Sequence, residues 1–275
     1  MATAELGEVS IHYQIAGDAG LPVLVLSHAL GVNMAMWEPQ VEAFSVHFRL
    51  LSYDVRGHGQ SSIPSGPYSV EDLGRDVLKL LDALEIQQVS FCGVSMGGLI
   101  GQWLGIHAPE RIDRLILSNT SAYLGPADQF DGRITSVLKA DPSETAEMFL
   151  RNWFPSNLLR ADGPMIAKIR EVLLATDPQG FAGSYAAVRD MDLRRPIALI
   201  SSPTLVIAGQ YDTVTLASHS DLIATTVPGA RLVTLPVVHL SNLELPDVFT
   251  RTTLEFLLLK GRTRKGQVNR ERPRS

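Results

Sequence analysis

A serine framed by glycines is the sequence feature with the clearest chemical meaning. Gly93-Val-Ser-Met-Gly97 follows the apolar run Val89–Cys92 and precedes a helix-like segment that begins at Leu99. In a turn between a strand and a helix, the glycines make room for a strained backbone that lifts the serine hydroxyl above the sheet edge. The N-terminus of the following helix favours negative charge at the same point. The pattern predicts that Ser95 is a nucleophile; the plainer interpretation is a Gly-rich turn with an incidental serine.

A serine hydroxyl needs a base that removes its proton and an acid that orients the base. Of the seven histidines, His239 lies a few residues after the last strand-like run and can return to the sheet edge. Asp212 lies just past an earlier buried run, at a strand end between Ser95 and His239. The alternative strand end carries Ser118-Asn-Thr120 and no carboxylate. We therefore expect a catalytic triad of Ser95, Asp212 and His239.

Hydrolysis of an acyl group also needs two backbone N–H groups aimed at the carbonyl oxygen as it becomes negative. Met96 supplies one of them, as the residue after the nucleophile. The second is expected from the loop after the apolar run Leu21–Leu26, and Leu30 is the candidate. His28, in the same loop, is interpreted as a residue that organises the loop rather than as a second base.

The other histidines have plainer interpretations. His58 lies in a turn in which Asp54 and Arg56 are expected to pair and hold the loop. His107 closes a helix, as a cation near a helix C-terminus does. We interpret both histidines as structural.

Strand-like and helix-like segments alternate along most of the chain. Ser69 followed by Asp72 is typical of a capping box, which starts a helix from about Val70 to Leu84. Repeated alternation with short links predicts an α/β fold with a doubly wound, mostly parallel sheet. The runs that predict buried strands are Leu21–Leu26, Phe48–Tyr53, Val89–Cys92, Arg114–Leu117, Thr204–Ala208 and Arg231–Leu235.

This alternation is interrupted in the middle of the chain, where four helix-like segments follow one another without a convincing strand. The sequence therefore predicts a core made of residues 1–121 and 200–260, with residues 122–199 as an inserted helical lid. Such an insertion belongs over the C-terminal strand ends, where a site would lie. Residues 261–275 are expected to form a basic, disordered tail. The helix-like segments of the lid are Asp131–Lys139, Ser143–Trp153, Pro164–Thr176 and Gly180–Arg189.

Composition and charge narrow the function classes. The chain has 275 residues, 45% of them hydrophobic, which suffices for a large core. Lys260–Ser275 holds seven Lys or Arg against one acid, so the rest of the chain carries a net charge of about −11, which argues against nucleic-acid binding. No apolar stretch has the length of a membrane span, and a single cysteine, Cys92, excludes an internal disulfide framework. The first eight residues do not read as an export signal, so we expect a cytoplasmic location.

No cofactor or metal is expected. No group of His, Cys and carboxylate residues has metal-ligand spacing, and no Gly-rich loop matches a dinucleotide or phosphate fingerprint. No lysine is placed for a Schiff base.

These residues give the chain a resemblance to the α/β-hydrolase superfamily over almost its whole length, and within it to the 3-oxoadipate enol-lactonases. The nucleophile turn and the turn that ends at Gly59 are shared across the superfamily. The residues around the serine and two stretches of the lid point to the enol-lactonases in particular. The matching stretches are Ser27–Gly31, Met36–Gln40, Tyr53–Gly59, Gly66–Leu73, Phe91–Gly98, Ala108–Arg111, Trp153–Phe154, Arg189–Arg194 and His239–Asn242.

The resemblance implies that the triad opens a five-membered enol-lactone to 3-oxoadipate, in bacterial breakdown of protocatechuate or catechol. Such a substrate carries a free carboxylate, which calls for a cation under the lid. Residues 122–200 hold nine Lys or Arg against ten acids, so one specific arginine must supply the attraction. Arg133 and Arg189 are the candidates, with a surface ion pair as the plainer interpretation of each. Trp153 is a further candidate for contact with the substrate.

Two other functions stay open. A broader carboxylesterase, lactonase or perhydrolase would use the same triad, and His28-Ala29 and Thr213–Ala217 depart from the enol-lactonase pattern in a way that fits such a relative. A ligand-binding receptor on a hydrolase scaffold would keep the fold without turnover. The expected partner is a small-molecule lactone or ester, with no nucleic acid and no membrane, and the oligomeric state is left open.

Overall fold

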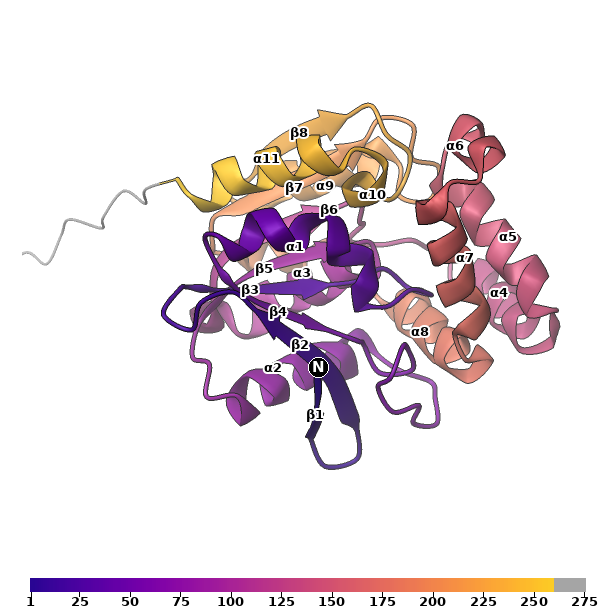
Figure 1. Ribbon diagram of the computed structural model, residues 1–275, viewed down its shortest axis with the longest axis horizontal. Helices are drawn as coiled ribbons and strands as arrows, with labels where there is room; N and C mark the ends of the chain where they lie inside the picture. The colour runs from indigo at the N-terminus through magenta and orange to yellow at the C-terminus, as the bar shows by residue number, and fades with distance from the viewer. Residues whose placement is uncertain (260–275) are drawn as a thin grey trace, which may run out of the picture.

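Eight strands form one sheet in the computed structural model, which describes residues 1–259 (Figure 1). Their spatial order is β1-β2-β4-β3-β5-β6-β7-β8. β1 pairs antiparallel with β2, and β2 with β4, whereas the six strands from β4 to β8 are parallel. The predicted doubly wound, mostly parallel sheet is therefore confirmed. The strands are β1 (Ala2–Glu5), β2 (Ser10–Ala16), β3 (Val23–Ser27), β4 (Arg49–Tyr53), β5 (Val89–Val94), β6 (Ile112–Ser118), β7 (Thr204–Gly209) and β8 (Arg231–Leu235).

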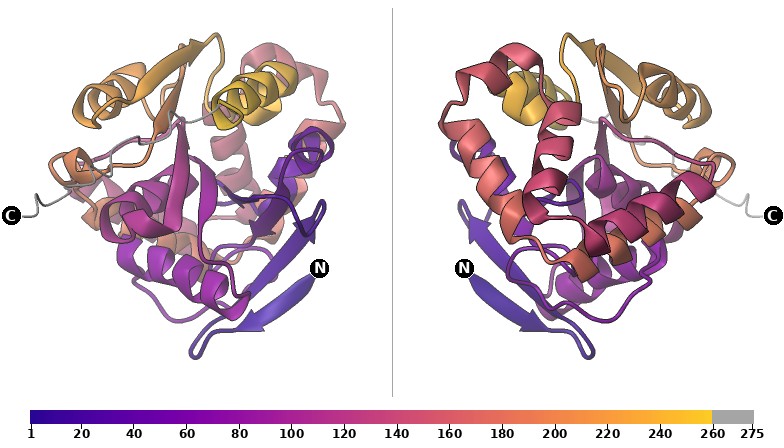
Figure 2. Two further views of the ribbon diagram at one scale, coloured as in Figure 1. Left: turned by 90° about the vertical axis from the view of Figure 1, so that its left-hand side faces the viewer. Right: turned by 90° about the vertical axis from the view of Figure 1, so that its right-hand side faces the viewer.

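Helices cover both faces of the sheet, as Figure 2 shows. α1 and α11 pack together on one face, and α2, α3 and α9 lie on the other. The helices of these two layers are α1 (Glu38–Ser45), α2 (Val70–Ala83), α3 (Met96–His107), α9 (Ala217–Thr226) and α11 (Pro246–Leu257). The shorter segments are the 3₁₀ turns η1 (Met34–Trp37), η2 (Pro109–Arg111) and η3 (Pro196–Leu199) and the one-turn helix α10 (Ser241–Glu244).

The N-terminus of α2 illustrates how the sequence sets these helices. The Ser69 hydroxyl accepts from the Asp72 N–H, and the Asp72 carboxylate accepts from the Ser69 N–H, so the predicted capping box is present. α2 then packs closely on α3, because Gly74 has no side chain where a Cβ would lie 2.0 Å from the Trp103 ring. This contact helps to hold α3, the helix that follows Ser95.

Five helices lie between β6 and β7 in the chain, on the right of Figure 1. α4 packs on α8, and α5 packs on α7. We call α4–α8 the lid. One of them, the short helix α6, has no counterpart among the predicted helices. The lid helices are α4 (Asp128–Lys139), α5 (Pro142–Trp153), α6 (Ser156–Ala161), α7 (Pro164–Ala175) and α8 (Pro178–Asp190).

The parallel strands bring distant parts of the chain to one edge of the sheet. Val94, the last residue of β5, pairs with Ser118, the last residue of β6, and Gly209 of β7 pairs with Leu235 of β8. The residues that follow these four strands therefore meet beside one another, under the lid.

None of the helices within residues 1–259 combines the length and the apolar character needed to cross a bilayer. The predicted tail, residues 261–275, lies outside the described residues.

Candidate active site

Ser95 occupies a strained turn between β5 and α3. Its backbone has φ 55° and ψ −114°, a left-handed conformation that a residue with a side chain adopts rarely. Glycines make the turn possible: a Cβ on Gly93 would lie 2.2 Å from the Gly97 backbone, and a Cβ on Gly97 would lie 2.2 Å from the Ser27 carbonyl oxygen. The two glycines recognised in the sequence therefore have the steric role expected of them.

The three residues predicted to form a triad lie in one hydrogen-bonded chain. The Ser95 hydroxyl oxygen is 3.0 Å from Nε2 of His239, and Nδ1 of His239 is 2.8 Å from Oδ2 of Asp212. His239 and Asp212 are buried, and they follow β8 and β7 respectively. This arrangement allows Nδ1–H to donate to Asp212 while Nε2 accepts the serine proton.

Asp212 receives five hydrogen bonds. Its Oδ1 accepts from the N–H groups of Val214 and Thr215, at 2.8 and 2.9 Å. Its Oδ2 accepts from the Thr215 hydroxyl at 2.8 Å and the Asn119 amide at 3.1 Å, besides His239. Burial raises the pKa of Asp212, but His239 and these hydrogen bonds outweigh it, so the net pKa is lowered. The carboxylate stays ionised and can stabilise a positive imidazole.

The lid also contributes to the placement of His239. The His239 N–H donates to the backbone carbonyl of Trp153 at 3.2 Å, at the end of α5. The Trp153 ring lies nearly parallel to the imidazole, with ring centroids 6.2 Å apart. Trp153, which the resemblance suggested as a substrate contact, thus lies beside His239 and lines the same cavity.

Leu30 and Met96, the expected oxyanion donors, both line the cavity that holds Ser95. Met96 begins α3, so its N–H has no partner within the helix. The Leu30 N–H donates to no backbone or side-chain acceptor within residues 1–259. Both groups are therefore available to a carbonyl oxygen above Ser95.

Two buried histidines hold the Leu30 loop. Nε2 of His28 accepts from the Val55 N–H at 2.8 Å, and Nε2 of His58 accepts from the Gly31 N–H at 2.9 Å. Burial lowers the pKa of His28 to about 4 and that of His58 to about 3, the latter also through the nearby His28. Both rings are neutral acceptors at pH 7, which agrees with their interpretation as structural residues.

One expectation for this region is wrong. Asp54 and Arg56 do not pair. Arg56 forms two 2.6 Å hydrogen bonds with Asp76 on α2, while Asp54 accepts from the N–H groups of Met34 and Gln60. The two residues of the turn therefore bind different partners, Arg56 the side chain of Asp76 and Asp54 two backbone N–H groups, and not each other.

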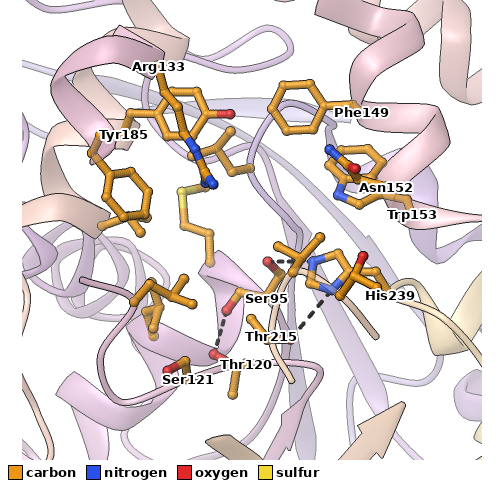
Figure 3. Close-up of a pocket in the computed structure, with 18 of the residues that line it drawn as sticks. Ser95, Thr120, Ser121, Arg133, Phe149, Asn152, Trp153, Tyr185, Thr215 and His239 are labelled. Atoms are coloured by element: carbon orange, nitrogen blue, oxygen red, sulfur yellow. Dashed lines mark hydrogen bonds between the residues drawn. The ribbon is translucent and has the colours of Figure 1, made fainter. Parts of the chain in front are cut away.

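A cavity of about 220 Å³ lies between Ser95 and the lid. Its floor comes from the strand ends and the N-terminus of α3, and its roof from α4, α5 and α8 (Figure 3). The residues that line it are Leu30, Ser95, Met96, Leu99, Thr120, Ser121, Leu124, Phe130, Arg133, Met148, Phe149, Asn152, Trp153, Tyr185, Val188, Thr213, Val214, Thr215 and His239.

The two arginine candidates are placed very differently. Arg133 on α4 lines the cavity, packs at 4.9 Å over the Phe130 ring, and directs its guanidinium inward in Figure 3. It has no carboxylate partner within residues 1–259. Arg189 does not line this cavity; it pairs with Asp131 at 2.8 Å and Asp190 at 2.7 Å. Arg189 is therefore not placed to bind a substrate carboxylate in this cavity. It forms a surface ion pair, which was the plainer interpretation of this residue.

Several residues of the cavity were not found from the sequence. Thr120, Asn152 and Tyr185 line it, and burial raises the pKa of the Tyr185 phenol, which stays a neutral hydrogen-bond donor. The position of Thr120, two residues after the end of the buried strand β6, was a usable signal. Asn152 and Tyr185 lie on lid helices, and helical periodicity alone does not show which side of a lid faces a cavity.

No group of three or more His, Cys, Asp or Glu side chains that could hold a metal ion occurs among the described residues, 1–259.

Comparison with known proteins places this chain in a family. Residues 22–246 match the family model described as the α/β hydrolase fold. The chain belongs to the α/β-hydrolase family. Over 242 residues it is 37% identical to 3-oxoadipate enol-lactonase 2 of Acinetobacter baylyi, covering 88% of this chain and 91% of that protein.

Solved structures give the same result. The chain is 39% identical to the enol-lactonase from Burkholderia xenovorans LB400, with a TM-score of 0.91 over 93% of this chain and 99% of that chain. A hydrolase from Pseudomonas aeruginosa is 56% identical, with a TM-score of 0.90 over 90% of this chain and 94% of that chain. The resemblance to the enol-lactonases suggested by the sequence is confirmed.

Proposed function

We propose that the protein hydrolyses a carboxylated enol-lactone, 3-oxoadipate enol-lactone, to 3-oxoadipate, with Ser95, His239 and Asp212 as its triad. The observation that carries the proposal is the 3.0 Å contact between the Ser95 hydroxyl and His239, made on the floor of the cavity beneath the lid. The names of the enol-lactonase relatives supply the substrate class.

The first half of the reaction forms an acyl-enzyme. His239 takes the Ser95 proton as the serine oxygen attacks the lactone carbonyl, and the N–H groups of Leu30 and Met96 stabilise the oxyanion. The ring C–O bond then breaks, and its electron pair leaves on the enol oxygen. His239 delivers the proton to that oxygen, and the enol tautomerises to a ketone. Because the leaving oxygen belongs to the ring, it stays attached to the acyl group.

The second half releases the product. His239 removes a proton from water as the water attacks the acyl carbonyl, and it returns the proton to the Ser95 oxygen as the ester bond breaks. The net change is addition of one water to the lactone. Asp212, held ionised by five donors, orients the imidazole and stabilises its positive form in both halves.

Arg133 is the group proposed to bind the substrate carboxylate. It is the arginine that lines the cavity, and no carboxylate within residues 1–259 neutralises it. An unpaired guanidinium favours an anionic ligand through charge-assisted hydrogen bonds. In this proposal α4–α8 act as a lid that brings Arg133 over Ser95 and limits access of water.

Kinetics with two substrates test the proposed specificity. We expect kcat/KM for 3-oxoadipate enol-lactone to exceed that for neutral p-nitrophenyl acetate by at least a hundredfold, because the acetate ester has no group for Arg133. Comparable values for the two substrates would instead favour a broad esterase or lactonase with the same triad. Failure of a fluorophosphonate to label Ser95 in the folded protein would favour a receptor without turnover.

A further inference from the structure

The end of β6 carries no acid, yet it is hydrogen bonded to two members of the proposed triad, Ser95 and Asp212, and to the loop that carries the third. The Ser95 N–H donates to the Ser118 carbonyl at 2.9 Å, and the Thr120 hydroxyl donates to the Ser95 carbonyl at 2.8 Å. Between these two residues, Asn119 points the other way, toward Asp212 and the loop after β8. Three consecutive residues therefore connect the nucleophile turn with the loops after β7 and β8.

The Asn119 side chain is buried and fully hydrogen bonded. Its amide nitrogen donates to Oδ2 of Asp212 and to the carbonyl oxygen of Val238, both at 3.1 Å. Its oxygen accepts from the hydroxyl groups of Ser118, at 2.8 Å, and Ser241. The amide thus uses two donors and two acceptor positions, which is its entire capacity.

The backbone of Asn119 is adapted to this role. Its φ is 45°, in the left-handed region, which Asn tolerates better than other residues with side chains. Its N–H donates to the Ile207 carbonyl of β7 at 2.8 Å, so the residue is fixed to the strand that leads to Asp212. The side chain then extends from β6 over the ends of β7 and β8.

We propose that Asn119 is a positioning residue that fixes Asp212 relative to His239 by bridging the Asp212 carboxylate to the carbonyl of Val238, the residue before the base. The inference rests on the proposed triad. A carboxamide suits this position because only it can donate to two oxygens while it accepts from two hydroxyls; a carboxylate would face Asp212 with a like charge.

Glycine is the informative substitution, because it accepts the left-handed backbone and removes only the side chain. In Asn119→Gly, Asp212 loses one donor and Val238 loses its bridge. We expect the second-order rate constant for fluorophosphonate labelling of Ser95 to fall about tenfold to a hundredfold at pH 8. This reaction depends on activation of Ser95 and not on which lactone the protein hydrolyses.

The pH profile separates positioning from simple loss of stability. With one donor fewer, the Asp212 carboxylate holds a proton on His239 more firmly, so the acid limb of the labelling profile moves to higher pH. The other ionisable groups near the pair are His219 on α9 and Glu244 on α10, which accepts from the Val238 N–H. Neither is altered by the substitution.

Two further variants keep the experiment decisive. Glu85→Gly replaces another residue with positive φ, 56°, in an exposed turn before the start of β5, whereas Ser95 follows the end of that strand, and it should leave labelling unchanged. If Asn119→Gly does not fold, Ser241→Ala removes one hydroxyl donor to Asn119. Because Asp212 keeps its five donors in this variant, both the loss of labelling and the displacement of the acid limb should be smaller than in Asn119→Gly, and in the same direction.

The outcomes are distinguishable. Slower labelling with a displaced acid limb supports the positioning role. An unchanged labelling rate and pH profile in the folded variant overturn the positioning role and leave the proposed triad intact. A lowered melting temperature without any change in labelling has the same meaning. Failure of the unsubstituted protein to be labelled at Ser95 overturns the proposed function itself.

Discussion

The floor and the roof of the cavity differ in how their polar groups are used. On the floor, Asp212 accepts five hydrogen bonds, and the Asn119 amide is fully paired. On the roof, Arg133 has no carboxylate partner and the Asn152 side chain no hydrogen bond within residues 1–259, although both line the cavity. The floor comes from the sheet, and the roof comes from the lid.

This difference indicates that the floor and the roof have separate roles, the floor in catalysis and the roof in binding the ligand. Full pairing of Asp212 and Asn119 holds the acid of the floor in one geometry, which is what stabilisation of a transition state requires. Unpaired groups on the roof retain their hydrogen-bonding capacity for a ligand. We therefore expect changes on the floor to affect every substrate alike, and changes on the roof to affect substrates according to their chemistry.

The largest effect is expected on the floor. Ser95→Ala removes the nucleophile and should lower kcat by a factor of about 10⁴ or more. The loss should be similar for the enol-lactone and for p-nitrophenyl acetate, since both need the same attack. Calorimetry should show that the variant still binds 3-oxoadipate. A variant that lost lactone turnover but kept ester turnover would show that the floor does not act on all substrates.

On the roof, Arg133→Met removes the charge while it keeps much of the packing against Phe130. We expect KM for the enol-lactone to rise about tenfold to a hundredfold, because a charge-assisted hydrogen bond to the carboxylate is lost. Turnover of p-nitrophenyl acetate should change little. Arg189→Met is the matched control: it removes another lid arginine, one that pairs with Asp131 and Asp190 outside the cavity, and should leave both KM values unchanged.

A smaller effect is expected in the loop that supports the floor. Because burial lowers the pKa of His58 to about 3, the folded protein keeps this ring neutral where the unfolded chain protonates it. Its contribution to stability is therefore complete above its usual pKa near 6.5 and is lost as the pH falls toward 3.

In His58→Gln the side-chain oxygen can still accept from Gly31, but the titration is gone. The free energy of unfolding should then fall less steeply between pH 6 and pH 4, by about 1.4 kcal/mol per pH unit. Urea unfolding at several pH values measures this slope. The exposed His47, changed to Gln, is the control. Identical slopes in the two variants would mean that His58 is not held neutral.

Much of the floor was predictable from the sequence because its geometry follows from local rules. The serine turn is set by Gly93 and Gly97. Asp212 follows the buried strand β7, and His239 follows β8, the parallel strand at the sheet edge, which is mostly exposed. In such a sheet, strand ends meet at one edge, so residues far apart in the chain come together. The start of α2 also follows from a local rule, because the capping box at Ser69 predicts it correctly.

The rest depended on contacts that no local pattern encodes. Arg133 and Arg189 both lie on lid helices, and only the packing of α4 on α8 directs one inward and the other to Asp131. Arg56 likewise finds Asp76 on α2 instead of its sequence neighbour Asp54. The sequence does not reveal the contacts of Asn119, because its amide acts on a carboxylate that another strand supplies.

The most direct test of the account is to trap the acyl-enzyme. Rapid acid quenching during turnover of 3-oxoadipate enol-lactone, followed by peptide mass spectrometry, should find an adduct on Ser95 with the mass of the whole lactone. Ring opening predicts this mass, because the leaving oxygen stays attached to the acyl group. An adduct on another residue, or steady turnover with no adduct on Ser95, would contradict the central claim.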